Sequence, residues 1–240
     1  MGYTKPFLFC FLFVLLFVFT NFISYTQTLD ENRAGSWLVI SGNNKIHERW
    51  SIPTVGILRH HDILEQYEFA FFRTGVSYQF NPSSTFTTGV AYLSSKNYTG
   101  SEEFKNASQF WVYEEFTLKM KAFSHRWRLE TRWKKNAENL HINNRVRYRL
   151  LYIKPLSKNT YIKSFNEIFL NLERPLFNQN RAYIGLGHIL TPSIKLDIGY
   201  LKNHFKTSDH DVIRMGITFK TDFTRNDIAN LQQPIPTNNK

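Results

Sequence analysis

The stretch Arg126–Lys134, which reads RWRLETRWK, alternates strictly between two kinds of side chain. Its even-numbered positions are all charged, and its odd-numbered positions carry only Trp, Leu and Thr. After a polar link at 136–141, the stretch Asn144–Leu150 (NRVRYRL) again places arginine at every second position. A side-chain period of two is typical of a β-strand whose two faces meet different surroundings. The two stretches therefore predict neighbouring strands that share one oily face and one cationic face.

Two kinds of architecture use such strands. A soluble β-sandwich would bury the oily face, whereas a membrane barrel turns that face to lipid and the charges to its lumen. Aromatic residues make up 16% of the chain, with 22 Phe and 12 Tyr, as expected for aromatic girdles at two membrane interfaces. The mean hydropathy of −0.37 fits a chain whose spanning segments are only half apolar. We predict an all-β fold, an antiparallel up-and-down transmembrane β-barrel of about 10–12 strands.

The same alternation marks the other expected strands. Segments of about 12–14 residues, rising ~3.3 Å per residue and tilted by ~40°, stand on the order of 30 Å tall and so match a membrane. Counting back from Phe223 gives about ten strands with both ends on the periplasmic side. The segment around Trp37 then makes an eleventh, which breaks the even number usual for these barrels. It either extends the wall with a partner that the sequence does not identify, or lies inside or beneath the barrel.

One acidic residue disturbs the pattern. In the strand expected over 108–122, Glu114 falls among the positions that should face lipid. We expect a β-bulge at Glu114–Glu115, which would turn the carboxylate of Glu114 inward.

Residues 1–26 read as a secretory signal peptide. Lys5 is their only charge, and the apolar run Phe7–Phe19 is shorter than the roughly 20 residues that a spanning helix needs. We expect cleavage before Gln27, which removes Cys10, the only cysteine, and places the mature chain in the bacterial outer membrane.

The mature chain divides into two parts. Residues 27–223 are expected to form the barrel, with the Trp37 segment as the open question, and residues 224–240 a disordered periplasmic tail. The net charge is +11, and loss of Lys5 leaves 29 basic residues against 19 acidic ones, or +10. Export and the placement of these charges along strands argue against nucleic acid as a partner. Outer-membrane lipids and lipopolysaccharide are the expected partners.

Several short motifs, in order, carry a resemblance to a known family. They are Arg73–Tyr78 (RTGVSY), His125–Glu130 (HRWRLE) with Arg132, Asn144–Arg149 (NRVRYR), Asn166–Phe169 (NEIF), Asn178–Arg181 (NQNR) and Gly199–Tyr200. Over roughly Trp37–Phe223 the chain resembles a bacterial outer-membrane β-barrel family of unknown function, of the flavobacterial type. The resemblance implies a barrel and an outer-membrane location, and it brings no activity or ligand. One departure is that such barrels usually finish on a terminal Phe, whereas residues 224–240 follow Phe223 here.

Charged residues on the inward parity would share one lumen. The predicted lumen cluster comprises Arg73, Arg128, Glu130, Arg132, Arg145, Arg147, Arg149, Glu167 and Arg181, with Glu115 and Asp197 as further acids. In a first interpretation, these side chains fill the barrel as ion pairs, because about eight strands leave just enough interior for side chains and open channels need about 16. The protein would then be structural, or of unassigned role, and not a general porin.

In a second interpretation, the surplus arginines form a site in the lumen or its loops. Guanidinium groups hold phosphate and carboxylate through paired hydrogen bonds, so the ligand would be a small anion or lipopolysaccharide.

A third interpretation is a barrel lipid hydrolase, which needs a Ser or Thr nucleophile, a His base and a third residue to orient it. Ser124–His125 lies in an expected periplasmic turn, and His60–His61–Asp62 lies in an expected outer loop with no serine near it in sequence. We therefore assign no catalytic residue. The sequence also contains no phosphate loop, dinucleotide fingerprint or zinc-ligand spacing, so we predict no cofactor and no metal site.

Overall fold

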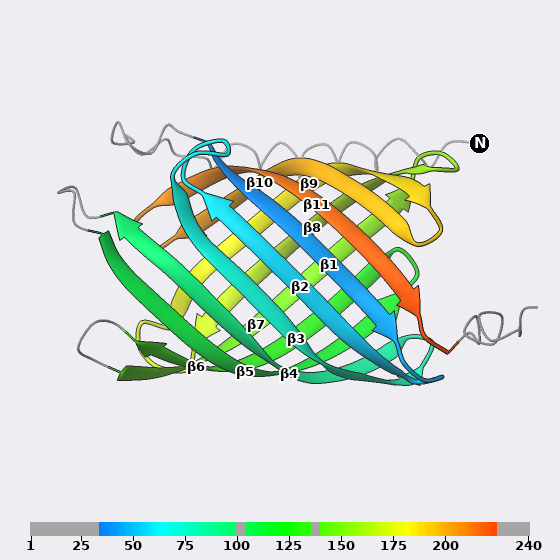
Figure 1. Ribbon diagram of the computed structural model, residues 1–240, viewed down its shortest axis with the longest axis horizontal. Coiled ribbons are helices and arrows are strands. Elements are labelled where there is room, and N and C mark those ends of the chain that lie inside the picture. Colours follow the sequence, from blue (N-terminus) through cyan, green and yellow to red (C-terminus); the bar gives the residue numbers. More distant parts are fainter. Residues whose placement is uncertain (1–33, 99–103, 136–139, 225–240) are drawn as a thin grey trace, which may run out of the picture. The chain divides into compact units, whose positions relative to one another are not determined.

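Eleven β-strands close into a barrel in the computed structural model, which describes residues 34–98, 104–135 and 140–224 (Figure 1). The strands are β1 (Gly35–Lys45), β2 (Trp50–His60), β3 (Tyr67–Asn81), β4 (Ser84–Tyr98), β5 (Phe104–Met120), β6 (Phe123–Lys135), β7 (Leu140–Pro155), β8 (Thr160–Asn171), β9 (Phe177–Thr191), β10 (Ile194–Phe205) and β11 (Asp209–Asp222). The prediction of an all-β, up-and-down barrel is confirmed. Within the described ranges, no helix is long and apolar enough to cross a membrane. The expected signal peptide and nearly all of the expected tail lie outside these ranges.

The first and last strands close the ring. Each strand pairs antiparallel with the next, but β1 pairs with β11 in parallel, with Trp37 opposite Arg214. In a meander of eleven strands, all odd-numbered strands run the same way, so the closing pair must be parallel. The Trp37 segment is therefore a full strand of the wall, and β11 is the partner that the sequence did not identify (Figure 1).

The connections fall into two groups. At one end, which we call the turn end, they are 46–49, 82–83, 121–122, 156–159 and 192–193. The connections at the other end, the loop end, include 61–66, 172–176 and 206–208. Asn81 shows how a tight turn forms, because its Oδ1 accepts hydrogen bonds from the backbone N–H of Ser83 (2.9 Å) and Ser84 (2.8 Å). β1 begins at the loop end, and β11 finishes at the turn end.

The cationic face of β6 and β7 lies inside the barrel. Arg128 is 3% exposed and Glu130 is 0% exposed, whereas their neighbours Trp127 and Leu129 are about two-fifths exposed on the outer wall. The alternation in the sequence thus predicts the side-chain directions correctly here.

The predicted bulge at Glu114–Glu115 is wrong. Pairing of β5 with both β4 and β6 runs through Glu114 without a shift, opposite Thr88 on one side and Leu129 on the other. The physical reason is that Trp111, Tyr113 and Glu115 all use one parity to face inward, and a bulge between them would turn part of this set outward. Glu114 therefore stays exposed on the outer wall.

Facing glycines make room for an inward tyrosine. Gly75 and Gly89 are direct partners across β3 and β4, and the hydroxyl of Tyr113 reaches over them to donate to the carbonyl of Thr74 (3.2 Å). A Cβ on Gly89 would lie 2.2 Å from the Thr74 carbonyl oxygen and 2.7 Å from the Cα of Gly75. Any larger residue would push the two strands apart.

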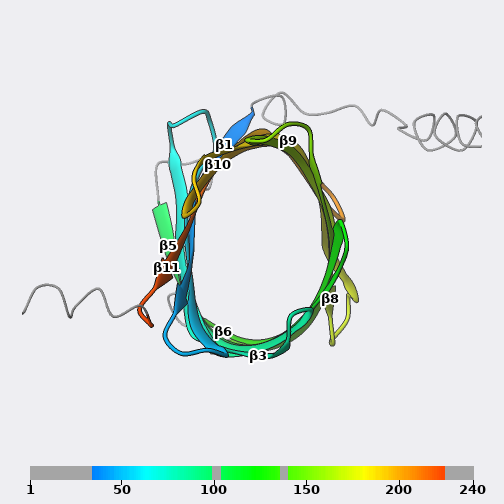
Figure 2. The ribbon, with the colours of Figure 1, turned by 90° about the vertical axis from the view of Figure 1, so that its right-hand side faces the viewer.

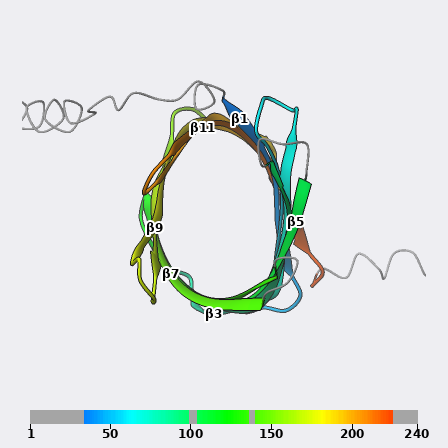
Figure 3. The same ribbon diagram turned by 90° about the vertical axis from the view of Figure 1, so that its left-hand side faces the viewer.

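The ring of strands is oval when seen from its ends (Figures 2 and 3). Eleven strands lie between the roughly eight whose interior side chains just fill and the 16 or more of an open aqueous channel. What occupies the interior is therefore decided by the length and pairing of the inward side chains.

Candidate functional site

Glu130 is the most buried acid of the lumen. Its Oε2 accepts from Nε (2.9 Å) and Nη2 (2.6 Å) of Arg145, and its Oε1 accepts from Nη1 of Arg147 (2.6 Å). Nη1 of Arg128 lies 3.5 Å from the same Oε1. Three guanidinium groups therefore surround one carboxylate, and they join the inner faces of β6 and β7.

Glu115 extends this network toward β3. Its carboxylate is bonded to Arg128 of β6, and it also lies 3.5 Å from Nη1 of Arg73 and 3.7 Å from Nε of Arg126. Because Arg73 stands on β3 and Glu115 on β5, the contact crosses over the small residues of β4 that lie between them. One of these is Ala91, the direct partner of Arg73.

Glu167 extends the network in the other direction, to β8. Its Oε1 accepts from Nη2 of Arg126 (2.5 Å) and from Nη2 of Arg147 (2.9 Å). Three acids and their arginines thus form one continuous ion-pair network from β3 to β8. Buried ion pairs of this kind are costly to break, because removal of one partner leaves an uncompensated charge.

Phe169 stands within a cluster of guanidinium groups, although it shares the inward face of β8 with Glu167. It is 0% exposed, and its ring centroid lies 4.2 Å from Arg147, 4.9 Å from Arg145 and 4.6 Å from Arg181. The guanidinium of Arg181 also lies 4.7 Å from the ring of Trp37 on β1. Cations are attracted to aromatic faces, and this attraction is strongest where water is excluded. These contacts between guanidinium groups and aromatic rings therefore link β7, β8 and β9 to β1 across the lumen.

Some lumen cations have no acid beside them. Among the described residues, no carboxylate lies within 4.0 Å of Arg132, Arg149 or Arg181. Arg132 donates to the amide oxygen of Asn143, and Arg181 donates through Nε to that of Asn203 (3.2 Å). The Nε of Arg149 is buried without a hydrogen-bond partner.

A second, smaller cluster surrounds Asp197 on β10. Its Oδ1 accepts from Nζ of Lys163 (3.1 Å) and from the hydroxyl of Tyr183 (3.0 Å), and it also bonds Arg214. Two cations therefore share one carboxylate, on the part of the wall opposite β4 and β5.

The inward side chains still leave a cavity of about 680 Å³ in the lumen. Arginines of β6, β7 and β9 line one part of it, and Val39, Ile57 and Phe71 of β1–β3 line another. A volume of this size lies within the ~300–1,000 Å³ of ordinary ligand pockets. The cavity is thus lined mainly by charged side chains over one part and mainly by apolar side chains over another.

The structure places all nine residues of the predicted lumen cluster on the inner wall. The network also depends on residues that the predicted cluster left out. Arg126 carried a usable signal, because it shares the parity of Arg128 and Glu130. Phe169 and Trp37 carried none, since their role depends on guanidinium groups from other strands.

The residues considered for hydrolysis lie in two separate places. Ser124 and His125 are neighbours on β6, and their side chains face opposite sides of the wall. Nδ1 of His125 forms a hydrogen bond of 2.9 Å with the hydroxyl of Tyr148. Ser36, which the sequence did not suggest, lies 3.5 Å from Nδ1 of His60. Ser36 is 0% exposed and its Oγ accepts from the backbone N–H of Leu64 (2.9 Å), so it ties down the 61–66 loop. Within the described ranges, no three His, Cys, Asp or Glu residues are grouped to hold a metal ion.

Comparison with known proteins gives a family and no function. A search of curated proteins finds no match to the chain. The family model described as "Protein of unknown function (DUF2490)" matches residues 34–214, from the residue before β1 to the middle of β11. This match spans about three quarters of the sequence and nearly the whole ring of strands. The chain therefore belongs to the DUF2490 family.

Proposed function

We propose that this protein is an outer-membrane β-barrel whose lumen is closed by its own side chains, so that it is not a general porin. The observation that carries the proposal is the continuous network of Glu130, Glu167 and their arginines, joined through Phe169 to the opposite wall. In this view the barrel is a structural element of the membrane, or a container for a ligand, rather than a channel.

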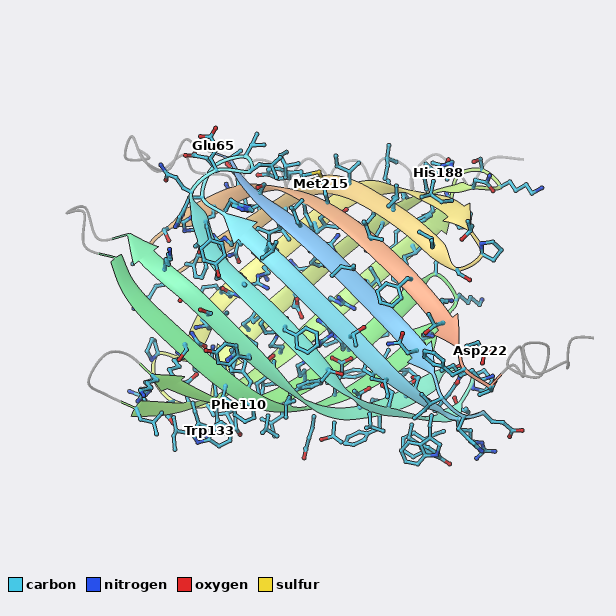
Figure 4. The ribbon with its side chains drawn as sticks, in the orientation of Figure 1. Glu65, Phe110, Trp133, His188, Met215 and Asp222 are labelled. Carbon is cyan, nitrogen blue, oxygen red and sulfur yellow. The ribbon has the colours of Figure 1, made fainter. Side chains whose placement is uncertain are left out.

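The outer wall supports a membrane location. Exposed apolar side chains cover it, and aromatic rings pair near both ends of the strands. Trp50 and Tyr78 pair at the turn end (4.8 Å between ring centroids), and Phe110 and Trp133 pair toward the loop end (5.9 Å; Figure 4). Aromatic girdles of this kind mark the two interfaces of outer-membrane barrels. The expected signal peptide over residues 1–26 is consistent with export, and outer-membrane lipids would be the partners of this wall.

Energetics supports a closed lumen as well as geometry. Charged side chains withdrawn from water are tolerated when they are paired and hydrogen-bonded, and opening a path would expose several arginines at once. Glu130 of β6 pairs with Arg145 and Arg147 of the adjacent strand β7, and Arg147 also pairs with Glu167 of β8. These side chains reach into the lumen, and the contacts of Arg181 with Phe169 and Trp37 connect β8 and β9 to β1 across it.

Conductance tests this proposal. The full mature barrel, purified in detergent and inserted into planar lipid bilayers, is expected to show no steady current of porin size. A general porin in the same membranes serves as the positive control, and the heat-dependent gel mobility of the recovered protein confirms that it is folded. Large, steady currents would overturn the closed-lumen proposal.

A further inference from the structure

The cavity in the lumen has two chemically different parts. On the inner face of β7, charged residues give way to apolar ones toward the turn end, in the order Arg145, Arg147, Arg149, Leu151, Ile153. Across the lumen, β1–β3 contribute Val39, Val55, Ile57 and Phe71 to the lining, and the two arginines on this side, Arg59 and Arg73, already pair with Glu68 and Glu115. A small inorganic anion would satisfy only the first part, and a hydrocarbon only the second.

The cavity as a whole has an excess of cations. Five basic residues that line the cavity have no carboxylate within 4.0 Å among the described residues: Arg132, Arg149, Arg181, Lys195 and Lys220. Glu68 and Glu167 are the acids among its lining residues, and both already pair with other arginines. An anion that entered the cavity would therefore meet positive charge that no protein group compensates.

Arg149 is the cation best placed to receive such an anion. Its Nε, like that of Arg132, is buried and has no hydrogen-bond partner, although buried polar atoms are nearly always satisfied. Its guanidinium lies 5.7 Å from the ring of Phe165, and Leu151 follows it on the same face. Arg149 thus stands at the boundary between the charged and apolar parts of the cavity.

We propose that the lumen cavity binds an amphipathic anion with one carboxylate or phosphate head and one alkyl chain. The head would pair with Arg149, whose guanidinium can give two parallel hydrogen bonds to either group. The chain would lie against Ile57, Phe71 and their apolar neighbours. The proposal deepens the closed-lumen function and rests on it, because a closed barrel retains a bounded cavity where an open pore would not.

Equilibrium binding to the mature barrel in phosphatidylcholine nanodiscs tests this inference, with empty nanodiscs subtracted to remove partitioning into lipid. The probes are radiolabelled decyl phosphate and decanoate, with decanol and inorganic phosphate as the probes that carry only the chain or only the head. We expect saturable binding at one site per barrel for decyl phosphate or decanoate, and none for decanol or inorganic phosphate at the same concentrations. The preference between the two heads distinguishes a lipid phosphate from a fatty acid.

Variants locate the site. Arg149→Gln removes a cation that has no acid partner, so the barrel should fold, and binding should weaken at least tenfold. Ile57→Thr should weaken binding by removing part of the apolar wall. Lys154→Gln, the same charge change at an exposed position of β7, should leave binding unchanged. Equal binding by Arg149→Gln and the unmodified barrel would overturn the proposal, as would decanol binding as tightly as decyl phosphate. Conductance remains the separate test of the closed lumen, so a barrel that is closed but binds no probe can be told apart from one that is open.

Discussion

Replacing Glu130 with glutamine is expected to lower the free energy of unfolding by about 3–5 kcal/mol. The change keeps the size of the side chain and removes the charge that Arg128, Arg145 and Arg147 share. Glu130 is fully buried, so water cannot replace the lost carboxylate. A urea titration of the folded barrel in detergent micelles, followed by tryptophan fluorescence, measures the loss.

A matched variant separates this effect from a general loss of acid. Glu114→Gln makes the same chemical change on the neighbouring strand β5, at an exposed position of the outer wall. We expect it to leave the free energy of unfolding unchanged or to raise it, because a charge on the lipid-facing wall beside Leu129 is itself destabilising. If Glu130→Gln were as stable as Glu114→Gln, the ion-pair network would not be what holds the lumen together.

Replacing Leu129 with arginine is expected to impair insertion of the barrel. Leu129 lies at the centre of β6 and is 42% exposed on the outer wall, where the proposed function places lipid. A cation that faces lipid at the midplane costs about 2–4 kcal/mol, and the cost falls to about 0–1 kcal/mol near the interfaces. Folding yield into lipid vesicles, read from the shift in gel mobility on heating, measures the effect.

The control variant places an arginine on the same outer wall, but at the end of a strand instead of at its centre. Met120 is the last residue of β5 at the turn end and is 55% exposed on the outer wall. Met120→Arg should therefore insert nearly as well as the unmodified chain. Equal yields for Leu129→Arg and Met120→Arg would mean that the centre of the outer wall does not face hydrocarbon.

Local alternation in the sequence was sufficient to predict the faces of the strands. In β6 and β7 every second residue is charged, and because a strand has a period of two, this pattern fixes which side chains meet in the lumen. The same rule explains the one wrong inference on β5. Glu114 was interpreted as an irregularity that required a bulge. Tyr113 and Glu115, however, alternate with it as the inward residues of a regular strand.

Features that depend on distant strands could not be predicted in this way. The parallel pairing of β1 with β11 is a consequence of the total strand number, and no local pattern around Trp37 carries it. Phe169 is an aromatic residue on a charged face. Its role is to contact Arg147 and Arg181 of the adjacent strands, and these contacts are visible only in the structure. The cavity depends on the summed lengths of side chains from most of the wall, so its size and its two parts required the structure.

The central claim is that lipid covers the outer wall of a closed barrel, and spin-label accessibility on β6 tests it most directly. Once residues 1–26 are removed, the chain contains no cysteine, so a label on Leu129→Cys or on Ser157→Cys in the turn 156–159 is unique. In isolated outer membranes, the account predicts that the label at Leu129 collides readily with oxygen and scarcely with a water-soluble nickel chelate. The label at Ser157 should show the reverse. A nickel chelate that reaches Leu129 as readily as Ser157 would contradict the account.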